Sequence, residues 1–465
     1  MKKNIISRMR FVVVMTLALG AAFAAQAQMG TLLYGSNRIP QNNAFNPAFF
    51  PQNNKIYIAL PALRANINMP LAYSDAIKYE AGDEYSTLDL NSISDAFSKS
   101  GGLGLNLDVH ALGAGFRVKN MFFTLSSQAK VSGYLAMPNE ILDFLQHGNA
   151  DHVGENDKLH LINGQFFNVQ AYTEYALGFG YEINKNITVG GHLKLYNGYL
   201  VAQPKDTKVD LFTAADYSQL RADMDYHVNF GGCLQFDDSN KVSGVTPVPN
   251  NWGFGLDLGA SYECDLFDAS ISILDLTPGI TWNQNVYQVS PVGGEVHVTF
   301  DGVDISGAAN GDGFDTTQFQ AIMDSLRTNI NPNFTEGGSF KTSIPTKFNA
   351  SANIHILPFL RAGLVFHGEY DKAMTQAPFR CSTSLLGHLN LADRFELVVG
   401  NTVVNNGFST DWFNPGFGVD IATARPVQLY FFVDYLSSLY VVDMKSVNMY
   451  LGLNVMIGNR KAEKK

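Results

Sequence analysis

The side chains that could take part in chemistry gather in one alternating stretch, residues 169–197. Glu174, His192 and Lys194 lie on the same side of its alternation, the side that also carries small and polar residues. A carboxylate, an imidazole and an ammonium group can pair, carry protons or bind a metal. For Glu174 and Lys194 we expect a salt bridge between paired strands or, as the simpler interpretation, a solvated network. We interpret His192 as a polar side chain of the same wet surface rather than a base or ligand.

The rest of the chain offers no recognisable catalytic or metal-binding set. It contains neither a Gly-x-Ser-x-Gly nor a His-Glu-x-x-His motif, and its ten histidines are scattered singly. Residues 310–315 hint at a calcium loop, but Phe314 occupies a ligand position and no glutamate closes the loop. We therefore predict no enzyme activity, no catalytic residues, no cofactor and no metal, and we interpret residues 310–315 as a polar surface loop.

A long hairpin positions the three polar side chains. Its first strand has an apolar face made of Val169, Ala171, Thr173, Tyr175, Leu177, Phe179 and Tyr181. The opposite face carries Glu174 among glycines and polar residues, and after a turn at residues 184–186 the alternation resumes with His192 and Lys194 on that face. Strands of this length with one polar face suit a membrane barrel. We predict that the apolar face contacts lipid and that Glu174, His192 and Lys194 face the lumen.

The same alternation recurs along the chain and predicts an all-β fold. We expect a single transmembrane antiparallel β-barrel of about 14 strands, in the range of about 14–16, with an N-terminal plug and short loop helices. Residues 224–236 form one further strand, and residues 447–457 form the last, amphipathic strand that closes the sheet. Helical spacing over residues 138–147 predicts a loop helix.

The two ends of the chain predict export and an outer-membrane location. Residues 1–27 combine four basic residues, an apolar core and a small-x-small site, which is typical of a cleaved signal peptide. The alternative, an N-terminal membrane anchor, is disfavoured because the apolar core is short. The barrel is expected over residues 55–458, followed by a basic tail at residues 459–465. A formal net charge of −10 argues against a nucleic-acid partner.

Residues 28–54, between the signal peptide and the first strand, do not read as a strand. They are rich in Asn, Gly and Pro and contain the run Asn46, Pro47, Ala48, Phe49, Phe50 and Pro51. The prolines cannot donate to a β-ladder. Such a segment is either a periplasmic tail or a plug folded into the lumen. The phenylalanines favour burial, so we predict a plug and name these six residues as a candidate gate.

A long insertion interrupts the barrel at about residues 283–343. It contains a stretch rich in Gly, Ala and Asp at residues 303–315 and a helical pattern over residues 316–329. Insertions of this length usually carry function or are disordered. In bacterial barrels the long loops are extracellular and the short turns periplasmic, so this insertion is a candidate surface for protein partners.

Three segments resemble a known family. Asn46 to Leu63, Ala171 to Gly198 and Ser272 to Trp282 look like a Bacteroidetes-type outer-membrane barrel family that is catalogued as a domain of unknown function. The early Asn-Pro-Ala segment is also similar to the hatch of FadL-type fatty-acid transporters and to barrels associated with type IX secretion. The resemblance implies a porin-like outer-membrane barrel of about 14 strands. It implies no established substrate and no catalytic residues.

Two functions remain open at this level. In the first, the barrel is a gated channel for hydrophobic or amphipathic small molecules, with residues 46–51 as the gate. In the second, it is a structural or secretion-associated component whose extracellular loops bind other proteins. A barrel-embedded hydrolase would need a Ser, a His and an acid on one lipid-facing rim, and the sequence shows no such set. The expected partners are outer-membrane lipid, a hydrophobic ligand in the first case and proteins in the second.

Overall fold

The computed structural model describes residues 30–458, except for residues 37, 52–53, 70, 73, 75–76, 79–86, 101, 148–151, 155–156, 217–218, 239, 293, 301–331, 375–376, 392–393, 408, 423–425 and 440–445. The predicted signal peptide, the basic tail, the polar loop at residues 310–315 and the helix expected at residues 316–329 lie outside the described residues.

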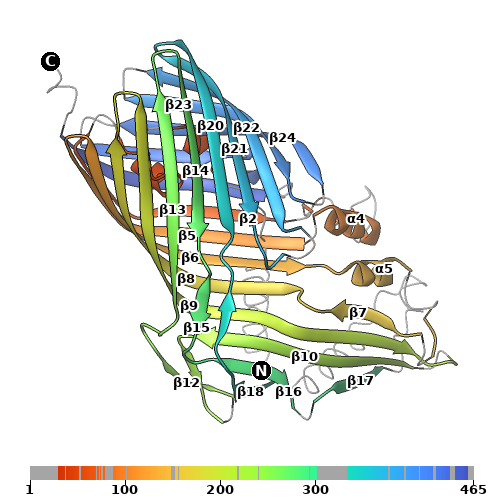
Figure 1. The fold of residues 1–465 in the computed structure, drawn as a ribbon. Coiled ribbons are helices and arrows are strands. Elements are labelled where there is room, and N and C mark those ends of the chain that lie inside the picture. The colour runs from red at the N-terminus through yellow and green to blue at the C-terminus, as the bar shows by residue number, and fades with distance from the viewer. Residues whose placement is uncertain are drawn as a thin grey trace, which may run out of the picture.

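The predicted fold class is confirmed, because the sheet closes on itself as an antiparallel barrel of 14 strands (Figure 1). The barrel strands are β1 (Ile56–Ala59) with β2 (Ala62–Asn68), β5 (Gly102–Val118), β6 (Met121–Ala136), β8 (Phe167–Glu182), β9 (Ile187–Thr213), β13 (Trp252–Glu263), β14 (Phe267–Leu276), β20 (Thr346–Leu357), β21 (Leu360–Tyr370), β22 (Phe379–Leu391), β23 (Phe395–Asn405), β24 (Thr410–Ala422), β25 (Val427–Val433) and β26 (Ser446–Ile457). Strands β1 and β2 share one position, because both pair with β5 on one side and β26 on the other. The pairing with β26 closes the barrel.

The two ends of the barrel differ in their connections. Short turns, such as residues 119–120, 183–186 and 358–359, join strands at the end where β1 begins and β26 finishes. The opposite end carries longer connections with helices α4 (Leu90–Ser100) and α5 (Asn139–His147), the second of which is the helix predicted over residues 138–147. Two small ladders, β3 (Ile77–Lys78) with β4 (Thr87–Leu88) and β11 (Leu234–Phe236) with β12 (Val242–Val245), lie outside the main sheet. Among the described helices, none is long and apolar enough to cross a membrane.

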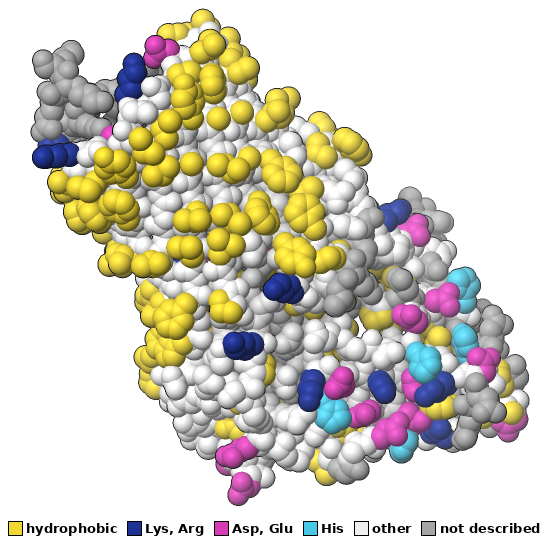
Figure 2. Space-filling model, viewed as in Figure 1, with side chains coloured by type: hydrophobic (Ala, Val, Ile, Leu, Met, Phe, Trp, Pro, Cys, Tyr) yellow, Lys and Arg dark blue, Asp and Glu magenta, His cyan; other side chains and the backbone are white. Residues whose placement is uncertain are grey.

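The outer surface of the barrel is apolar on every strand. Its exposed side chains include Ile56, Leu63, Phe116, Leu125, Leu177, Leu193, Phe254, Ile271, Ile354, Leu364, Leu385, Val399, Ile421, Leu429 and Leu451. On the face shown in Figure 2, hydrophobic side chains are spread over the barrel, whereas charged side chains gather beyond it. The alternate positions face inward and are mostly polar, as in β8, where Glu174 is buried between the half-buried Thr173 and the exposed Tyr175.

The barrel sheet continues beyond the barrel itself as an extension of the same wall. Residues Ile187 to Asn197 of β9 pair with β13, and residues Leu200 to Thr213 continue outward and pair with β10 (Leu220–Gly232). This extension also contains β7 (Leu159–Asn163), β16 (Tyr287–Pro291), β17 (Val296–Phe300) and β18 (Pro332–Glu336). Strands β15 (Ile280–Trp282) and β19 (Phe340–Thr342) connect it to the barrel.

The strand predicted at residues 224–236 therefore forms only in part, and outside the barrel. Strand β10 ends at Gly232, and Leu234 to Phe236 form β11, which pairs with β12 in a separate small sheet. Because β9 is longer than the barrel wall, β13 takes the place beside its first half, and β10 pairs only with its outer half. Alternation identified the strand but carried no information on its neighbour, since period-two patterns look alike in every sheet.

The N-terminal segment lies inside the barrel. It forms α2 (Thr31–Gly35) and the 3-10 helix η1 (Pro40–Ala44), drawn in red and orange within the upper barrel in Figure 1. A second 3-10 helix, η2 (Leu436–Leu439), lies in the connection between β25 and β26. Leu32, Leu33, Ile39 and Phe45 of the segment are buried against inward-facing wall residues.

We predict that the outer surface of the barrel is embedded in lipid, and a matched pair of arginine substitutions tests this. Leu193 on the barrel is 65% exposed, and Val245 on the small β11–β12 ladder outside the barrel is 61% exposed. Arginine at Leu193 should lower the free energy of unfolding in lipid vesicles by about 2–4 kcal/mol, because a charge would enter hydrocarbon. Arginine at Val245 should change it by less than about 0.5 kcal/mol. Equal, small effects in a denaturant titration would contradict a lipid-facing Leu193.

Candidate functional site

The N-terminal segment from Gly30 to Pro51, which we call the plug, is joined to the barrel wall at its beginning by polar contacts. The backbone N–H of Thr31 donates to Asp434 Oδ2 at 3.1 Å, and the hydroxyl of Ser384 donates to Thr31 Oγ1 at 2.7 Å. The hydroxyl of Ser36 donates to Glu396 at 2.5 Å. These contacts attach α2 to β22, β23 and the end of β25.

The candidate gate residues form the other end of the plug. Asn46 is fully buried, and its amide group donates to Tyr34 Oη at 3.2 Å and to the carbonyl of Ile271 at 3.2 Å. Its own Oδ1 accepts the backbone N–H of Ala48 at 2.9 Å. Asn46 therefore folds the Asn-Pro-Ala turn and attaches it to the wall with one side chain.

Two wall glycines leave room for this turn. A Cβ at Gly190 would lie 2.2 Å from the Pro47 carbonyl oxygen, and a Cβ at Gly259 would lie 2.1 Å from Asn46 Oδ1. No side chain fits at such distances, so the close approach of the plug to β9 and β13 depends on glycine at both positions.

Phe50 anchors the turn at the end of the barrel where the short connections lie. Its ring packs against Tyr57 and Phe122, with ring centroids 5.3 and 5.0 Å apart, and the Arg117 guanidinium lies 4.8 Å from its centroid. The ring of Phe49 packs on Tyr34, with the centroids 5.2 Å apart. Of the two neighbouring phenylalanines, Phe49 therefore contacts the plug and Phe50 contacts the barrel wall.

His192 joins the wall to the plug. Its Nδ1 lies 2.9 Å from Asp257 Oδ2 and its Nε2 lies 2.9 Å from Asn43 Oδ1. The Asn43 amide nitrogen donates to the carbonyls of Pro47 and Phe49, which turns its oxygen toward His192. Both ring nitrogens therefore lie within hydrogen-bond distance of an oxygen, one on the wall and one on the plug. The structure thus gives His192 a specific plug contact, whereas the sequence suggested only a polar wall residue.

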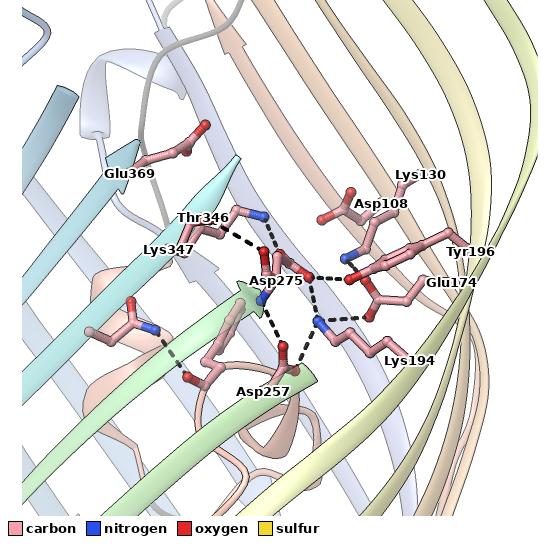
Figure 3. Close-up of polar contacts among 12 residues, drawn as sticks. Asp108, Lys130, Glu174, Lys194, Tyr196, Asp257, Asp275, Thr346, Lys347 and Glu369 are labelled. Atoms are coloured by element: carbon pink, nitrogen blue, oxygen red, sulfur yellow. Dashed lines mark hydrogen bonds and ion pairs between the residues drawn. The ribbon is translucent and has the colours of Figure 1, made fainter. Parts of the chain in front are cut away.

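Lys194 lies at the centre of a buried group of charges on the wall (Figure 3). Its Nζ is 2.6 Å from Asp275 Oδ1, 2.9 Å from Asp257 Oδ2 and 3.4 Å from Glu174 Oε1. Lys130 pairs with Glu174 at 2.7 Å and Lys347 with Asp275 at 3.1 Å. We call the six residues Lys130, Glu174, Lys194, Asp257, Asp275 and Lys347 the charged network. Each carboxylate in it faces at least one ammonium group, so the network is neutralised internally.

The plug lies between two cavities. The first, about 60 Å³ in volume, is lined on one side by Leu33 and Phe45 of the plug and on the other by Lys130, Lys194 and Asp275 of the charged network. The second, about 430 Å³, opens at the short turns, and its lining includes Phe49 and Phe50 of the plug together with residues 184–186 of the hairpin turn.

The barrel wall is irregular beside the first cavity, at a break where one ladder bond remains, from the Leu60 N–H to the Leu453 carbonyl at 3.0 Å. The ladder of β1 ends at Ala59 and that of β2 begins at Ala62, so Leu60 and Pro61 separate two paired stretches of one wall position. Between Ala59 and Leu63 the wall has one more residue than the facing stretch of β26, which is a β-bulge. Pro61 has no N–H to give to the ladder. Ala62 and Leu63, directly after the break, also line the first cavity.

The structure thus brings the sequence-derived candidates into one continuous site. Glu174 and Lys194 lie in the charged network, His192 joins that network to the plug, and residues 46–51 lie within the barrel. Sequence reasoning missed Asn43, Asp257 and Asp275. A signal existed for Asp257, which alternates with the outward-facing Leu256 and Leu258, but pairing β13 with β9 was needed to align it with Lys194. Asp275 shares the parity of the exposed Ile271 and is buried only because the register between β13 and β14 shifts beside it, which no alternation predicts.

Comparisons with known proteins identify a family and a set of similar folds. The sequence model of a family described as "Family of unknown function (DUF5723)" matches residues 47–434. No curated protein sequence matches the chain. The toluene transporter TodX of Pseudomonas putida is similar in fold, with 9% identity, 93% of this chain and 97% of that chain covered, and a TM-score of 0.42.

Two further solved structures are similar at lower scores. A FadL homologue of Pseudomonas aeruginosa has 11% identity, 94% of this chain and 97% of that chain covered, and a TM-score of 0.37. The translocator domain of the autotransporter NalP from Neisseria meningitidis has 6% identity, 87% and 90% coverage, and a TM-score of 0.30.

Replacing Lys194 by methionine should unfold the wall around the charged network. The substitution keeps the length of the side chain but leaves Glu174, Asp257 and Asp275 without their shared cation. Removing one partner of a buried ion pair costs about 3–5 kcal/mol, and we expect a loss of unfolding free energy in this range.

The matched control is methionine at Lys205, whose side chain is exposed on the outer part of β9. It should leave the denaturant midpoint within about 0.5 kcal/mol of the parent protein. If both lysine variants unfold at the same denaturant concentration, the charged network does not stabilise the wall.

Proposed function

The chain belongs to the DUF5723 family of unknown function, and we propose that it is an outer-membrane channel in which the plug controls the passage of hydrophobic or amphipathic small molecules. The proposal has three parts: the location, the path and the control. Each is supported by a separate feature of the molecule.

The location is supported by the outer surface of the barrel. A closed ladder leaves no unpaired sheet edge, and closure of this kind is what allows strands to cross hydrocarbon. Every barrel strand carries exposed apolar side chains, which together we call the apolar belt. The charged side chains of the extension lie beyond this belt (Figure 2). The signal peptide expected at residues 1–27 agrees with export to such a membrane.

The path is supported by the break in the wall, and this observation carries the proposal. Leu60 and Pro61 interrupt the strand at the place where the first cavity touches the wall through Ala62 and Leu63. A molecule that widens this break would pass between the first cavity and the apolar belt without crossing the full lumen. A bulge with an unpaired proline opens more easily than a regular ladder.

The lining of the first cavity supports an amphipathic passenger. Leu33, Phe45 and Leu274 offer apolar surface, whereas the ion pairs of Arg64 with Asp108 and of Lys194 with Asp275 offer polar groups close by. Such a combination suits a molecule with an apolar body and a polar end.

The control is supported by the nature of the plug contacts. Some of them are individual hydrogen bonds between polar side chains, such as those of His192 with Asn43 and of Ser384 with Thr31. Others are hydrophobic contacts. The plug is one continuous segment joined to β1 at only one end, so it can move without breaking the barrel ladder.

The alternative is a structural or secretion-associated component that binds proteins through its outer end. A specific observation favours it. Beyond the 14 barrel strands, the wall continues as an extension formed by the outer half of β9 with β7, β10, β16, β17 and β18, and these strands take no part in closing the barrel. In that case the plug would stay closed, and the extension would be the functional surface.

A reversible disulfide between plug and wall tests the channel. Thr31 Oγ1 and Ser384 Oγ are 2.7 Å apart, so cysteines at these two positions are placed to form a disulfide. The three native cysteines are free and are replaced by serine in the background protein. In proteoliposomes, uptake of a labelled long-chain fatty acid should be lost in the oxidised double variant and return on reduction.

Each single-cysteine variant serves as the control and should transport in both redox states. Deletion of residues 30–50 should raise the leak of small polar solutes, since the plug fills the lumen. If neither the parent protein nor the deletion admits fatty acid or polar solute, the channel proposal fails. A stable protein partner that remains bound to the parent protein but not to a variant lacking the extension would then support the alternative.

A further inference from the structure

A cluster of ionisable side chains lies on the extension, at the outer end of the strand β9 whose first half carries Lys194 of the charged network. The antiparallel register places His160 of β7 opposite Asp210, Asp210 opposite Asp223, and Asp223 opposite His297 of β17. Four strands thus contribute one row of the order His-Asp-Asp-His across the sheet. Figure 2 shows histidine, acidic and basic side chains gathered over this part of the molecule.

The residues on the opposite face of the same sheet show toward which side the side chains of the row point. Val209, Leu211, Ala222, Met224, Val296 and Val298, which alternate with the row, form two apolar clusters. Since side chains alternate along a strand, burial of these residues places the row on the outer face of the sheet. On that face the side chains of His160 and His297 are exposed, whereas Asp210 and Asp223 are buried.

Three groups at one end of the row converge on a single point. Asp223, Glu295 and His297 each offer a ligand atom, and these atoms all lie within 4.8 Å of one another. His297 Nδ1 is 2.5 Å from Asp223 Oδ1. Glu295 and His297 are two residues apart and so share a face, whereas Asp223 reaches them from the neighbouring strand.

We propose that Asp223, Glu295 and His297 bind a divalent transition-metal ion of the zinc class on the extension. One imidazole nitrogen and two carboxylate oxygens are a donor set that zinc accepts, and water would complete a four-coordinate site at this exposed position. Calcium and magnesium prefer oxygen ligands alone, so the imidazole argues against them. The proposal is independent of the channel, because none of these residues lies in the barrel wall.

The surrounding charges favour a further cation. Asp210 and Asp223 lie directly opposite each other, which is destabilising for like charges unless cations compensate them. Lys158 pairs with Asp210, and Arg221 holds Asp223 with contacts of 3.0 and 3.2 Å. Together with Glu295 there are three carboxylates against these two cations, which leaves an excess negative charge beside His160 and His297.

Arg221 makes the proposal testable, because it occupies the oxygens that a metal would use. In a simple ion-pair cluster, removal of Arg221 would only destabilise the extension. In a metal site, removal of this competitor should strengthen binding. The two interpretations therefore predict opposite effects of Arg221→Ala on metal affinity.

The experiment titrates Zn²⁺ into the full, chelator-treated protein in detergent by calorimetry, with Co²⁺ absorption as an optical readout. We expect saturable binding of a single ion per chain. His297→Ala and Glu295→Gln should each weaken it by about tenfold or more, and Arg221→Ala should strengthen it. His227→Ala is the matched control, since His227 faces Asp225 at 3.4 Å on β10, and should leave the affinity unchanged.

Three results would overturn the site. They are the absence of saturable Zn²⁺ binding to the parent protein, equal affinity in the parent and His297→Ala, and binding of Ca²⁺ or Mg²⁺ as tight as that of Zn²⁺. Heat-modifiable gel mobility establishes that each variant is folded. If His297→Ala does not fold, the Co²⁺ spectrum of Glu295→Gln decides, because a lost or altered spectrum supports the site and an unchanged one refutes it.

Discussion

Closure of the β-ladder between β26 and the β1–β2 pair is the constraint on which the rest of the molecule depends. Once every barrel strand has two neighbours, no edge remains, and the alternation of each strand divides its side chains between an outer and an inner surface. The outer surface is apolar throughout. Most polar side chains of the strands therefore face the interior. They include aspartates and lysines, whose burial is energetically unfavourable unless they are paired with an opposite charge.

The interior solves this problem in two ways. The charged network surrounds Lys194 with three carboxylates, two of which contact a further lysine, so charges buried on the wall neutralise one another. The plug supplies partners for other polar wall residues, as Asn43 does for His192 and Ser36 for Glu396. Stability of the wall and docking of the plug are therefore coupled through His192, which contacts Asp257 of the network and Asn43 of the plug.

The break at Leu60 and Pro61 and the extension beyond β9 are departures from a regular barrel, and they occur in different parts of the molecule. The break lies beside the plug and the first cavity, where it bears on passage through the wall. The extension carries its own apolar clusters and a polar face with the His-Asp-Asp-His row. A transport path and a metal-binding surface can thus be altered by separate substitutions.

Alternation along the chain by itself determined the all-β class, the barrel and the sides of the opening hairpin, because the side-chain period of a strand is local. It placed Glu174, His192 and Lys194 on one face and showed that residues 46–51 do not have the pattern of a strand. Only the tertiary structure decided which strands are neighbours. It moved β10 out of the barrel, brought Asp257 and Asp275 to Lys194, and turned Asn43 toward His192, because contacts between residues so distant in sequence depend on strand pairing, on which a local pattern carries no information.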